Sequence, residues 1–168
     1  MTAAVVLLAL VTLQRLAELV YGRANEQRLR GLGAVEIGAA HYPLIVLLHA
    51  AWLVALWVFG SGQPLVWPWV ALFALLQLGR GWVLATLGRR WTTRVMVVSG
   101  ETLVRRGPYR LVSHPNYVVV ALEIFVLPLA LGLPWLAILF GLLNLAMLAW
   151  RIRVEGRALS RLTASSTH

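Results

Sequence analysis

The chain has 168 residues, the length of one domain, and 60% of them are hydrophobic while only 12% are charged. A water-soluble domain carries about twice that share of charged residues. So few charges cannot cover a surface in contact with water, which excludes a soluble globular protein. We therefore predict that lipid surrounds most of the exterior.

The charged residues are unusual in kind, because 15 Arg occur without any Lys and six Glu without any Asp, for a net charge of +9. The arginines lie between apolar runs and not along one soluble stripe, so a membrane explains them better than nucleic acid does. The absence of Cys excludes disulfides and cysteine nucleophiles. We predict no metal site, because His41, His49 and His114 lack the short spacing of metal ligands.

Five apolar runs are long enough, or nearly so, to cross a hydrocarbon core that needs roughly 20 helical residues. They cover about residues 3–20, 43–60, 64–87, 116–131 and 134–150. The first run lacks a preceding positive charge and a small-residue cleavage site, so we interpret it as a span and not as a signal peptide. The sequence therefore predicts an all-α integral membrane protein of about five transmembrane helices, forming one domain over residues 1–168.

The arginines between the runs predict an orientation. They concentrate in the connections 21–42 and 88–115 and in the C-terminal tail, whereas the connections 61–63 and 132–134 carry no charge. The positive-inside rule then places the N-terminus outside and the C-terminus inside. The connection 132–134 reads Gly-Leu-Pro and predicts a tight turn, so the last two helices form a hairpin.

Polar residues in the first three runs are unfavourable in lipid and mark points of interest. Gln14, Arg15 and Glu18 are spaced three and four apart, which is typical of an ion pair near a helix end. Arg80 in the third run either reaches toward the membrane surface or binds an anion. His49 in the second run either forms a hydrogen bond in the interior or contacts a ligand.

The fourth run starts at Pro115, directly after His114, and a helix start favours an anion such as a carboxylate. Asn116, Val120 and Glu123 then share one helical face. A carboxylate as deep as Glu123 either bonds to a neighbouring helix or lines a cavity, because an unpaired charge in lipid is very unfavourable.

The fifth run carries a similar stripe. Asn144, Arg151 and Glu155 follow one another at spacings of seven and four. Arg151 and Glu155 alone are consistent with a surface ion pair, but Asn144 extends the stripe into the membrane. Together the two stripes predict a polar pocket between the last two helices.

These two stretches resemble the signature of the isoprenylcysteine carboxyl methyltransferase family. The first reads Gly107-Pro108-Tyr109-Arg110-Leu111-Val112-Ser113-His114-Pro115-Asn116-Tyr117, and the second reads Arg151-Ile152-Arg153-Val154-Glu155-Gly156-Arg157-Ala158-Leu159. Both occur in the family's order and are separated by a helical hairpin. The N-terminal half resembles a bacterial branch, some members of which methylate lipophilic pyrones. Ser113 and Gly156 depart from the signature, which usually has Arg and a second Glu there.

The resemblance implies that S-adenosylmethionine binds in the half of the chain covering about residues 77–160 and open to the cytosol. It implies cofactor contacts from a set of residues around the start of the fourth helix: Tyr109, His114, Pro115, Tyr117 and Glu123. Arg80, His49 and Asn144 are expected to contact the acceptor. Arg151 is expected to align an acceptor oxygen, and Glu155 either orients Arg151 or acts as a general base for a hydroxyl.

We therefore predict an S-adenosylmethionine-dependent O-methyltransferase in a bacterial inner membrane, with its active site facing the cytoplasm. Its acceptor is a lipophilic molecule or lipidated group, resembling a prenylcysteine or an alkylpyrone, that is methylated on a carboxylate or an acidic hydroxyl. Two alternatives remain open at this point. One is a phospholipid or amine N-methyltransferase, and the other is a membrane scaffold without catalytic activity.

Overall fold

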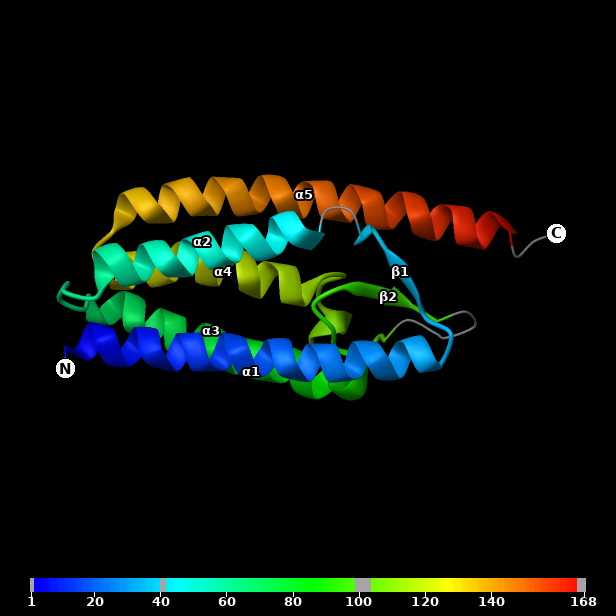
Figure 1. Cartoon of the computed structure of the whole chain (residues 1–168), viewed down its shortest axis with the longest axis horizontal. Helices are drawn as coiled ribbons and strands as arrows, with labels where there is room; N and C mark the ends of the chain where they lie inside the picture. The colour runs from blue at the N-terminus through cyan, green and yellow to red at the C-terminus, as the bar shows by residue number, and fades with distance from the viewer. Residues whose placement is uncertain (1, 40–41, 99–103, 166–168) are drawn as a thin grey trace.

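A computed structural model describes residues 2–39, 42–98 and 104–165. Helices account for most of these residues, as Figure 1 shows. The elements in chain order are α1 (Ala3–Gly31), β1 (Val35–Ile37), α2 (Tyr42–Gly60), α3 (Trp67–Leu87), the 3-10 helix η2 (Gly88–Arg90), β2 (Val95–Val97), the 3-10 helix η3 (Gly107–Arg110), α4 (Pro115–Ala130) and α5 (Pro134–Ser165).

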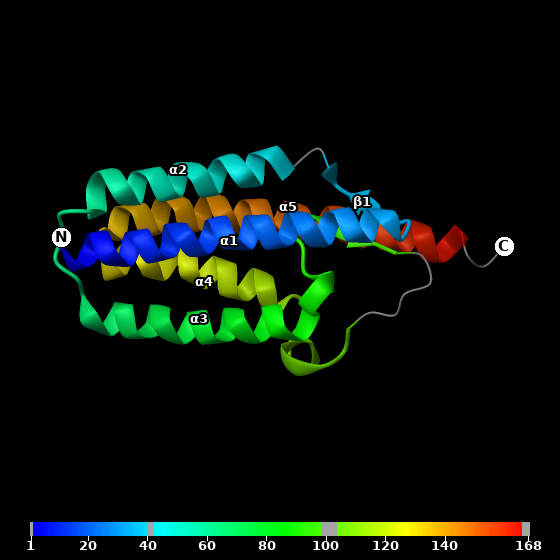
Figure 2. The same ribbon diagram turned by 60° about the horizontal axis from the view of Figure 1, so that its bottom comes forward.

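The helices run along one long axis, and α4 lies between α3 and α5 (Figure 2). Four of them, α1, α2, α3 and α5, are long and apolar enough to cross a membrane, and α4 is a shorter apolar helix of 16 residues. Many large apolar side chains on their outer faces are exposed, for example Leu13, Val20, Leu47, Leu78 and Leu142. This combination confirms the prediction of an all-α, multi-pass membrane protein.

Two helices continue well past the apolar runs that predicted them. α1 extends from the run 3–20 to Gly31, because Arg30 bonds to Glu26 one turn earlier and the chain reaches a positive φ of 82° only at Gly33. α5 similarly continues past residue 150. Both projecting ends lie on the same side of the bundle (Figure 1).

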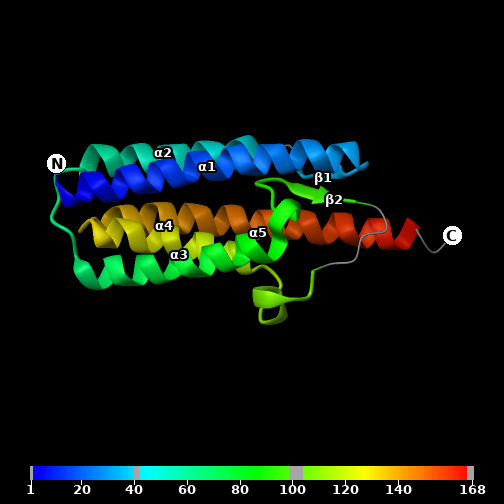
Figure 3. The ribbon, with the colours of Figure 1, turned by 90° about the horizontal axis from the view of Figure 1, so that it is seen from below.

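A two-stranded antiparallel sheet lies between the projecting parts of α1 and α5 (Figures 1 and 3). It pairs Val35 with Val97 and Ile37 with Val95. Both strands lie in segments predicted as connections, because three-residue strands leave too little alternation to distinguish them from loops. Arg94 and Arg30 fix β1 to its surroundings, since both donate to the Glu36 carboxylate at 2.5 Å.

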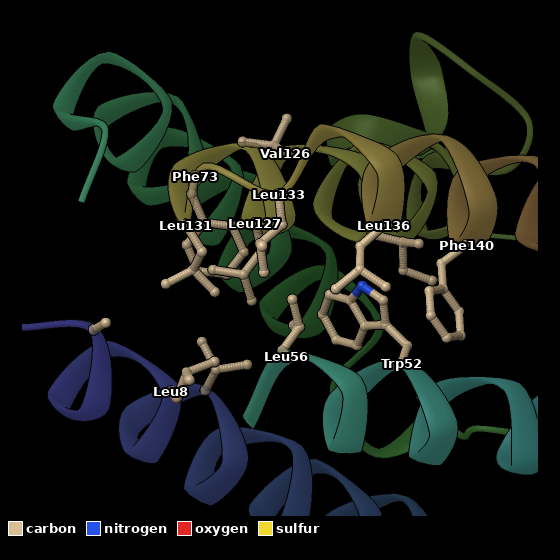
Figure 4. Packing of buried hydrophobic residues seen from close by; sticks show 13 residues of the cluster. Leu8, Trp52, Leu56, Phe73, Val126, Leu127, Leu131, Leu133, Leu136 and Phe140 are labelled. Atoms are coloured by element: carbon tan, nitrogen blue, oxygen red, sulfur yellow. The ribbon is translucent and has the colours of Figure 1, made fainter. Parts of the chain in front are cut away.

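The apolar core occupies the end of the bundle opposite the sheet. Leu8 of α1, Leu56 of α2 and Leu127 of α4 are fully buried there, and Figure 4 shows Trp52 of α2 extending toward Leu136 and Phe140 of α5. Gly132 has a φ of 67°, a conformation that favours glycine, and it closes the α4–α5 turn as the sequence predicts. This packed end leaves the other half of the bundle to form a cavity.

Candidate active site

A cavity of about 320 Å³ opens among the helices on the sheet side of the core. Every long helix contributes to its wall, together with the segment 91–93 that follows η2. The volume lies at the lower end of the range typical of small-molecule sites. From the helical rise, the cavity extends from Trp52, roughly 12 Å from the outer end of α2, to Arg151, roughly 25 Å along α5 from its start. It therefore connects mid-membrane depth with the arginine-rich end.

The walls facing α1 and α2 are mostly apolar. Leu16 and Leu19 of α1 line the cavity opposite Val46, Ala50 and Leu53 of α2. Leu16 and Val46 are also substantially exposed on the outer face, at 54% and 41%. The apolar wall is thus continuous with the surface that contacts lipid acyl chains.

Several buried polar atoms of the residues around this cavity lack hydrogen-bond partners. Within the described residues, five buried side-chain atoms have no hydrogen-bond partner: Arg15 Nε, Trp52 Nε1, Trp91 Nε1, Asn116 Oδ1 and Asn144 Nδ2. All five residues line the cavity. A buried polar atom without a partner costs about 1–3 kcal/mol, and such atoms rarely gather by chance. These five residues therefore leave hydrogen bonds incomplete around the cavity, and side-chain rotation toward a ligand with acceptor and donor groups would complete them.

The end of the cavity toward the sheet holds a stack of three side chains. The guanidinium carbon of Arg151 lies 5.1 Å from the ring centroid of Tyr117, and the His114 ring stacks on Tyr117 at 5.0 Å. Arg151 also donates to the backbone carbonyl of Thr93 at 3.3 Å. Tyr117 and Arg151 line the cavity, whereas His114 is exposed and stacks on the Tyr117 ring.

The start of α4 lies next to this stack, as the sequence predicts. His114 is its N-cap residue, Pro115 is buried at the first helical position, and Asn116 lines the cavity. Tyr109, in η3, is half-buried away from the cavity wall, and burial raises the pKa of its hydroxyl to about 12. The Tyr109 hydroxyl therefore stays protonated at physiological pH.

Glu123 does not line the cavity or lie where a cofactor would contact it, although the resemblance implied such a contact. It is 1% exposed, and its carboxylate accepts from Arg80 at 2.5 and 2.9 Å, from Arg15 at 2.7 Å and from Gln77 at 2.9 Å. It is not among the cavity-lining residues, since the two guanidinium groups enclose it. Of the two roles left open by the sequence, the geometry matches the bond between helices.

Arg80 completes an ion network at membrane depth. Its Nη1 donates to Glu18 at 3.1 Å, and Gln14 joins Glu18 to Gln77 with distances of 3.0 and 2.7 Å. Two arginines and two glutamates balance, so the network is neutral. The ion pair predicted between Arg15 and Glu18 is thus part of a larger cluster that links α1, α3 and α4.

His49 and Asn144 both line the cavity at mid-membrane depth. His49 Nδ1 bonds to the carbonyl of Ile45 at 2.8 Å, which matches the interior hydrogen bond that the sequence favours while the ring still faces the cavity. Asn144 is 1% exposed. The structure therefore brings together Arg80, His49, Asn144, Tyr117 and Arg151 around one volume.

His41 and the side chain of Glu155 lie outside the described residues. The two departures from the family signature, Ser113 and Gly156, are both exposed, and a side chain at Gly156 would meet open space.

Several cavity residues could not be identified from the sequence, among them Trp52, Trp91 and Thr93. Trp91 and Thr93 belong to a connection, and they reach the cavity because Asn25 of α1 donates to the Trp91 carbonyl at 2.8 Å. Trp52 lies three residues after His49 and shares its helical face, so the expected role of His49 could have predicted that Trp52 also lines the cavity.

Residues 69–161, more than half of the chain, match the model of the isoprenylcysteine carboxyl methyltransferase (ICMT) family. This range contains both motifs and the residues of α4 and α5 that line the cavity. "Uncharacterized protein YpbQ" of Bacillus subtilis (strain 168) is 40% identical over 159 residues, which cover 91% of this chain and 94% of the relative. No solved structure matches the chain.

Proposed function

The chain belongs to the isoprenylcysteine carboxyl methyltransferase family, and on that premise we propose that it is an S-adenosylmethionine-dependent O-methyltransferase. The acceptor is a carboxylate or an acidic hydroxyl on a lipophilic molecule, resembling a prenylcysteine or an alkylpyrone. The observation that carries the proposal is the gathering of all five unpartnered buried polar atoms on one cavity. That cavity joins the two motif-bearing helices to the lipid-facing surface.

The sheet-side end of the cavity fits the chemical groups of the cofactor. Trp91 offers an aromatic surface for an adenine, and Tyr117 offers the edge of its ring, because its faces carry His114 and Arg151. Within the described residues, Asn116 Oδ1 and the Trp91 indole N–H are an acceptor and a donor without partners. Arg151 offers a cation for the cofactor carboxylate. The start of α4 adds the partial positive charge of a helix N-terminus. When bound there, the cofactor would supply an electrophilic methyl group on a sulfonium.

The role of Arg151 follows from its depth. The sequence-based interpretation assigns Arg151 to the acceptor oxygen, but the residue lies at the sheet-side end, over the ring of Tyr117. We therefore assign its guanidinium to the cofactor carboxylate. Glu155, one turn further along α5, stays a predicted partner or base.

The apolar wall between α1 and α2 supports a lipophilic acceptor. Leu16, Leu19, Val46 and Leu53 provide an apolar surface for an alkyl chain. Transfer of the chain from water to such a surface is worth about 0.8 kcal/mol for each methylene group, and its transfer from the bilayer is nearly neutral. The polar residues at mid-membrane depth then face the acceptor's head group. Binding both reactants in one water-poor volume orients them for displacement.

Binding of S-adenosylhomocysteine to the detergent-purified full-length protein tests the proposal. Calorimetry should give a saturable signal that weakens when Asn116→Leu removes the unpartnered acceptor atom. Leu78→Ala, on the lipid-facing side of α3, is the matched control and should bind like the wild type.

The acceptor class is tested by incubation with labelled S-adenosylmethionine and lipid extracts. Label in an ester or ether product supports the proposal, and label in an amine product indicates the N-methyltransferase alternative. Absence of both cofactor binding and product would leave only a scaffold.

A further inference from the structure

The deep end of the cavity presents hydrogen-bond donors from three helices. Within the described residues, Arg15 Nε on α1, Trp52 Nε1 on α2 and Asn144 Nδ2 on α5 are buried without partners, and all three residues line the cavity. Trp52 and Asn144 are 2% and 1% exposed, so these donors lie just beneath the cavity wall and no water satisfies them there. Rotation of the side chains toward a bound head group would pair the donors with its oxygens, which favours a head group with more than one oxygen that accepts hydrogen bonds.

His49 adds a group of the opposite kind. A carbonyl oxygen only accepts, so the bond of 2.8 Å to Ile45 requires a proton on His49 Nδ1. A singly protonated imidazole then has a lone pair on Nε2. Among the described residues, no hydrogen bond occupies Nε2. Besides the three donor residues, the same wall therefore has one basic nitrogen, His49 Nε2.

This set distinguishes two classes of acceptor. A carboxylate has only accepting oxygens, so it would satisfy the three donors but meet the His49 lone pair unfavourably. A hydroxyl beside carbonyl or ether oxygens satisfies both kinds of group, because its proton points to Nε2. A carboxylate also needs no base, whereas a hydroxyl does.

We propose, resting on the proposed function, that His49 is the general base for a hydroxyl-bearing, oxygen-rich head group held by Trp52 and Asn144. The hydroxyl oxygen forms a bond to the methyl carbon as the carbon–sulfur bond of the sulfonium donor breaks, with its electron pair remaining on sulfur. The hydroxyl proton passes to His49 Nε2. The positive charge of the donor thus ends on the imidazolium, which later releases the proton to water.

The test uses 4-nitrophenol carrying a long alkyl chain, whose absorbance reports how far its hydroxyl proton is transferred. Bound to the wild-type protein without cofactor, its absorption band should shift toward that of the phenolate. His49→Gln should abolish the shift, because its amide can keep the bond to Ile45 but cannot take the proton. Trp52→Phe should weaken binding about tenfold and keep the shift.

Three controls make the outcome specific. Leu47→Ala, on the lipid-facing side of α2, should bind the probe like the wild type. S-adenosylhomocysteine should bind His49→Gln with wild-type affinity, which shows that the variant is folded. The matching alkyl nitroanisole has no hydroxyl proton and should bind more weakly than the phenol.

An unchanged shift in His49→Gln would overturn the proposal, and a shift lost in Glu155→Gln instead would assign the base to Glu155. Tighter binding of an alkylbenzoic acid than of the phenol would indicate a carboxylate acceptor. In each of these three outcomes, retained binding of S-adenosylhomocysteine would leave the proposed function standing. Loss of that binding in the wild type, with the probe shift present, would reject the proposed function alone.

Discussion

Tyr117 connects three of the residues predicted from the family motif. Its ring faces the cavity, carries Arg151 at 5.1 Å and stacks with His114 at 5.0 Å. His114 is exposed and does not line the cavity, so we expect it to act mainly by holding this ring in place.

Tyr117→Ala should weaken binding of S-adenosylhomocysteine by about tenfold or more, because it removes the ring that carries Arg151 at the cavity, and the loss of one such contact costs roughly 1–3 kcal/mol. His114→Ala should weaken it less, because the Tyr117 ring remains. Calorimetry on both variants, with thermal unfolding to show that they are folded, measures the difference. Equal affinity in the wild type and both variants would remove this stack from the cofactor site.

Arg151→Ala should lower the affinity for S-adenosylhomocysteine about tenfold or more, because a charge-assisted bond to a carboxylate is lost. Arg151→Lys should restore part of it, since the charge remains but the planar fork is lost. The same calorimetry applies. Wild-type affinity together with a large loss of turnover would instead return Arg151 to the acceptor oxygen.

Among the elements, α1, α3 and α4 are joined by charge as well as by apolar packing. Glu123 on α4 accepts from Arg15 on α1 and Arg80 on α3, and Glu18 on α1 accepts from the same two arginines. Removing one charge leaves another buried without its counter-ion, which typically costs about 3–5 kcal/mol. The cluster also holds Arg15 and Arg80 in the cavity wall.

Glu123→Leu should strongly lower the thermal unfolding temperature in detergent, because Arg80 loses its main counter-ion. The double variant Glu123→Leu with Arg80→Met should recover much of that loss, since no uncompensated charge remains at that pair. Glu26→Gln, at the projecting end of α1, is the comparison outside the apolar run, and it should change stability far less because its partners Arg30 and Arg94 are partly exposed to solvent. A small effect of Glu123→Leu would show that water reaches the cluster.

The strand pair depends on charge in a different way. Burial alone would raise the pKa of Glu36, but hydrogen bonds from Arg94 and Arg30 outweigh it and hold that pKa below its ordinary value of 4.5. A lowered pKa in the folded state means that Glu36 stabilises the fold above about pH 4.5 and that this contribution disappears as the pH falls.

The stability difference between wild type and Glu36→Gln should accordingly be present near pH 7 and shrink below pH 4.5. Thermal unfolding in detergent across that range measures it. The effect should be small, because the pair lies near the surface and is screened by solvent. A difference independent of pH would mean that the shape of the side chain, and not its charge, fixes β1.

The helices were largely predictable and the site only partly. Apolar runs identified each helix because lipid exposure requires them, and the two motifs predicted the family correctly. The cavity wall from Trp91 and Thr93 was not predictable, since it depends on the bond from Asn25, 66 residues away, to the Trp91 carbonyl. Glu123 shows the same limit, because one helical face does not reveal which neighbouring helix supplies the counter-ion.

At the scale of the whole molecule, charge is distributed unequally between the two ends of the bundle. The turns at the end opposite the sheet, 61–63 and 132–134, carry no charge, whereas Arg89, Arg94 and Arg106 lie at the sheet end. The sheet-side mouth of the cavity is therefore the arginine-rich one. We propose that this end faces the cytoplasm of a bacterial inner membrane, where a soluble methyl donor is available.

Reporter fusions test this orientation, since arginine-rich connections resist translocation. A fusion after residue 62 should be active outside the membrane, and fusions after residue 100 and at the C-terminus should be active inside. Replacing the arginines at 89, 90 and 94 with Gln should weaken the preference, whereas three Gln substitutions at the exposed, uncharged positions Ala24, Leu32 and Val35 should not. The reverse pattern would place the cavity mouth outside the cell, away from the methyl donor, and would contradict the proposed function together with the orientation.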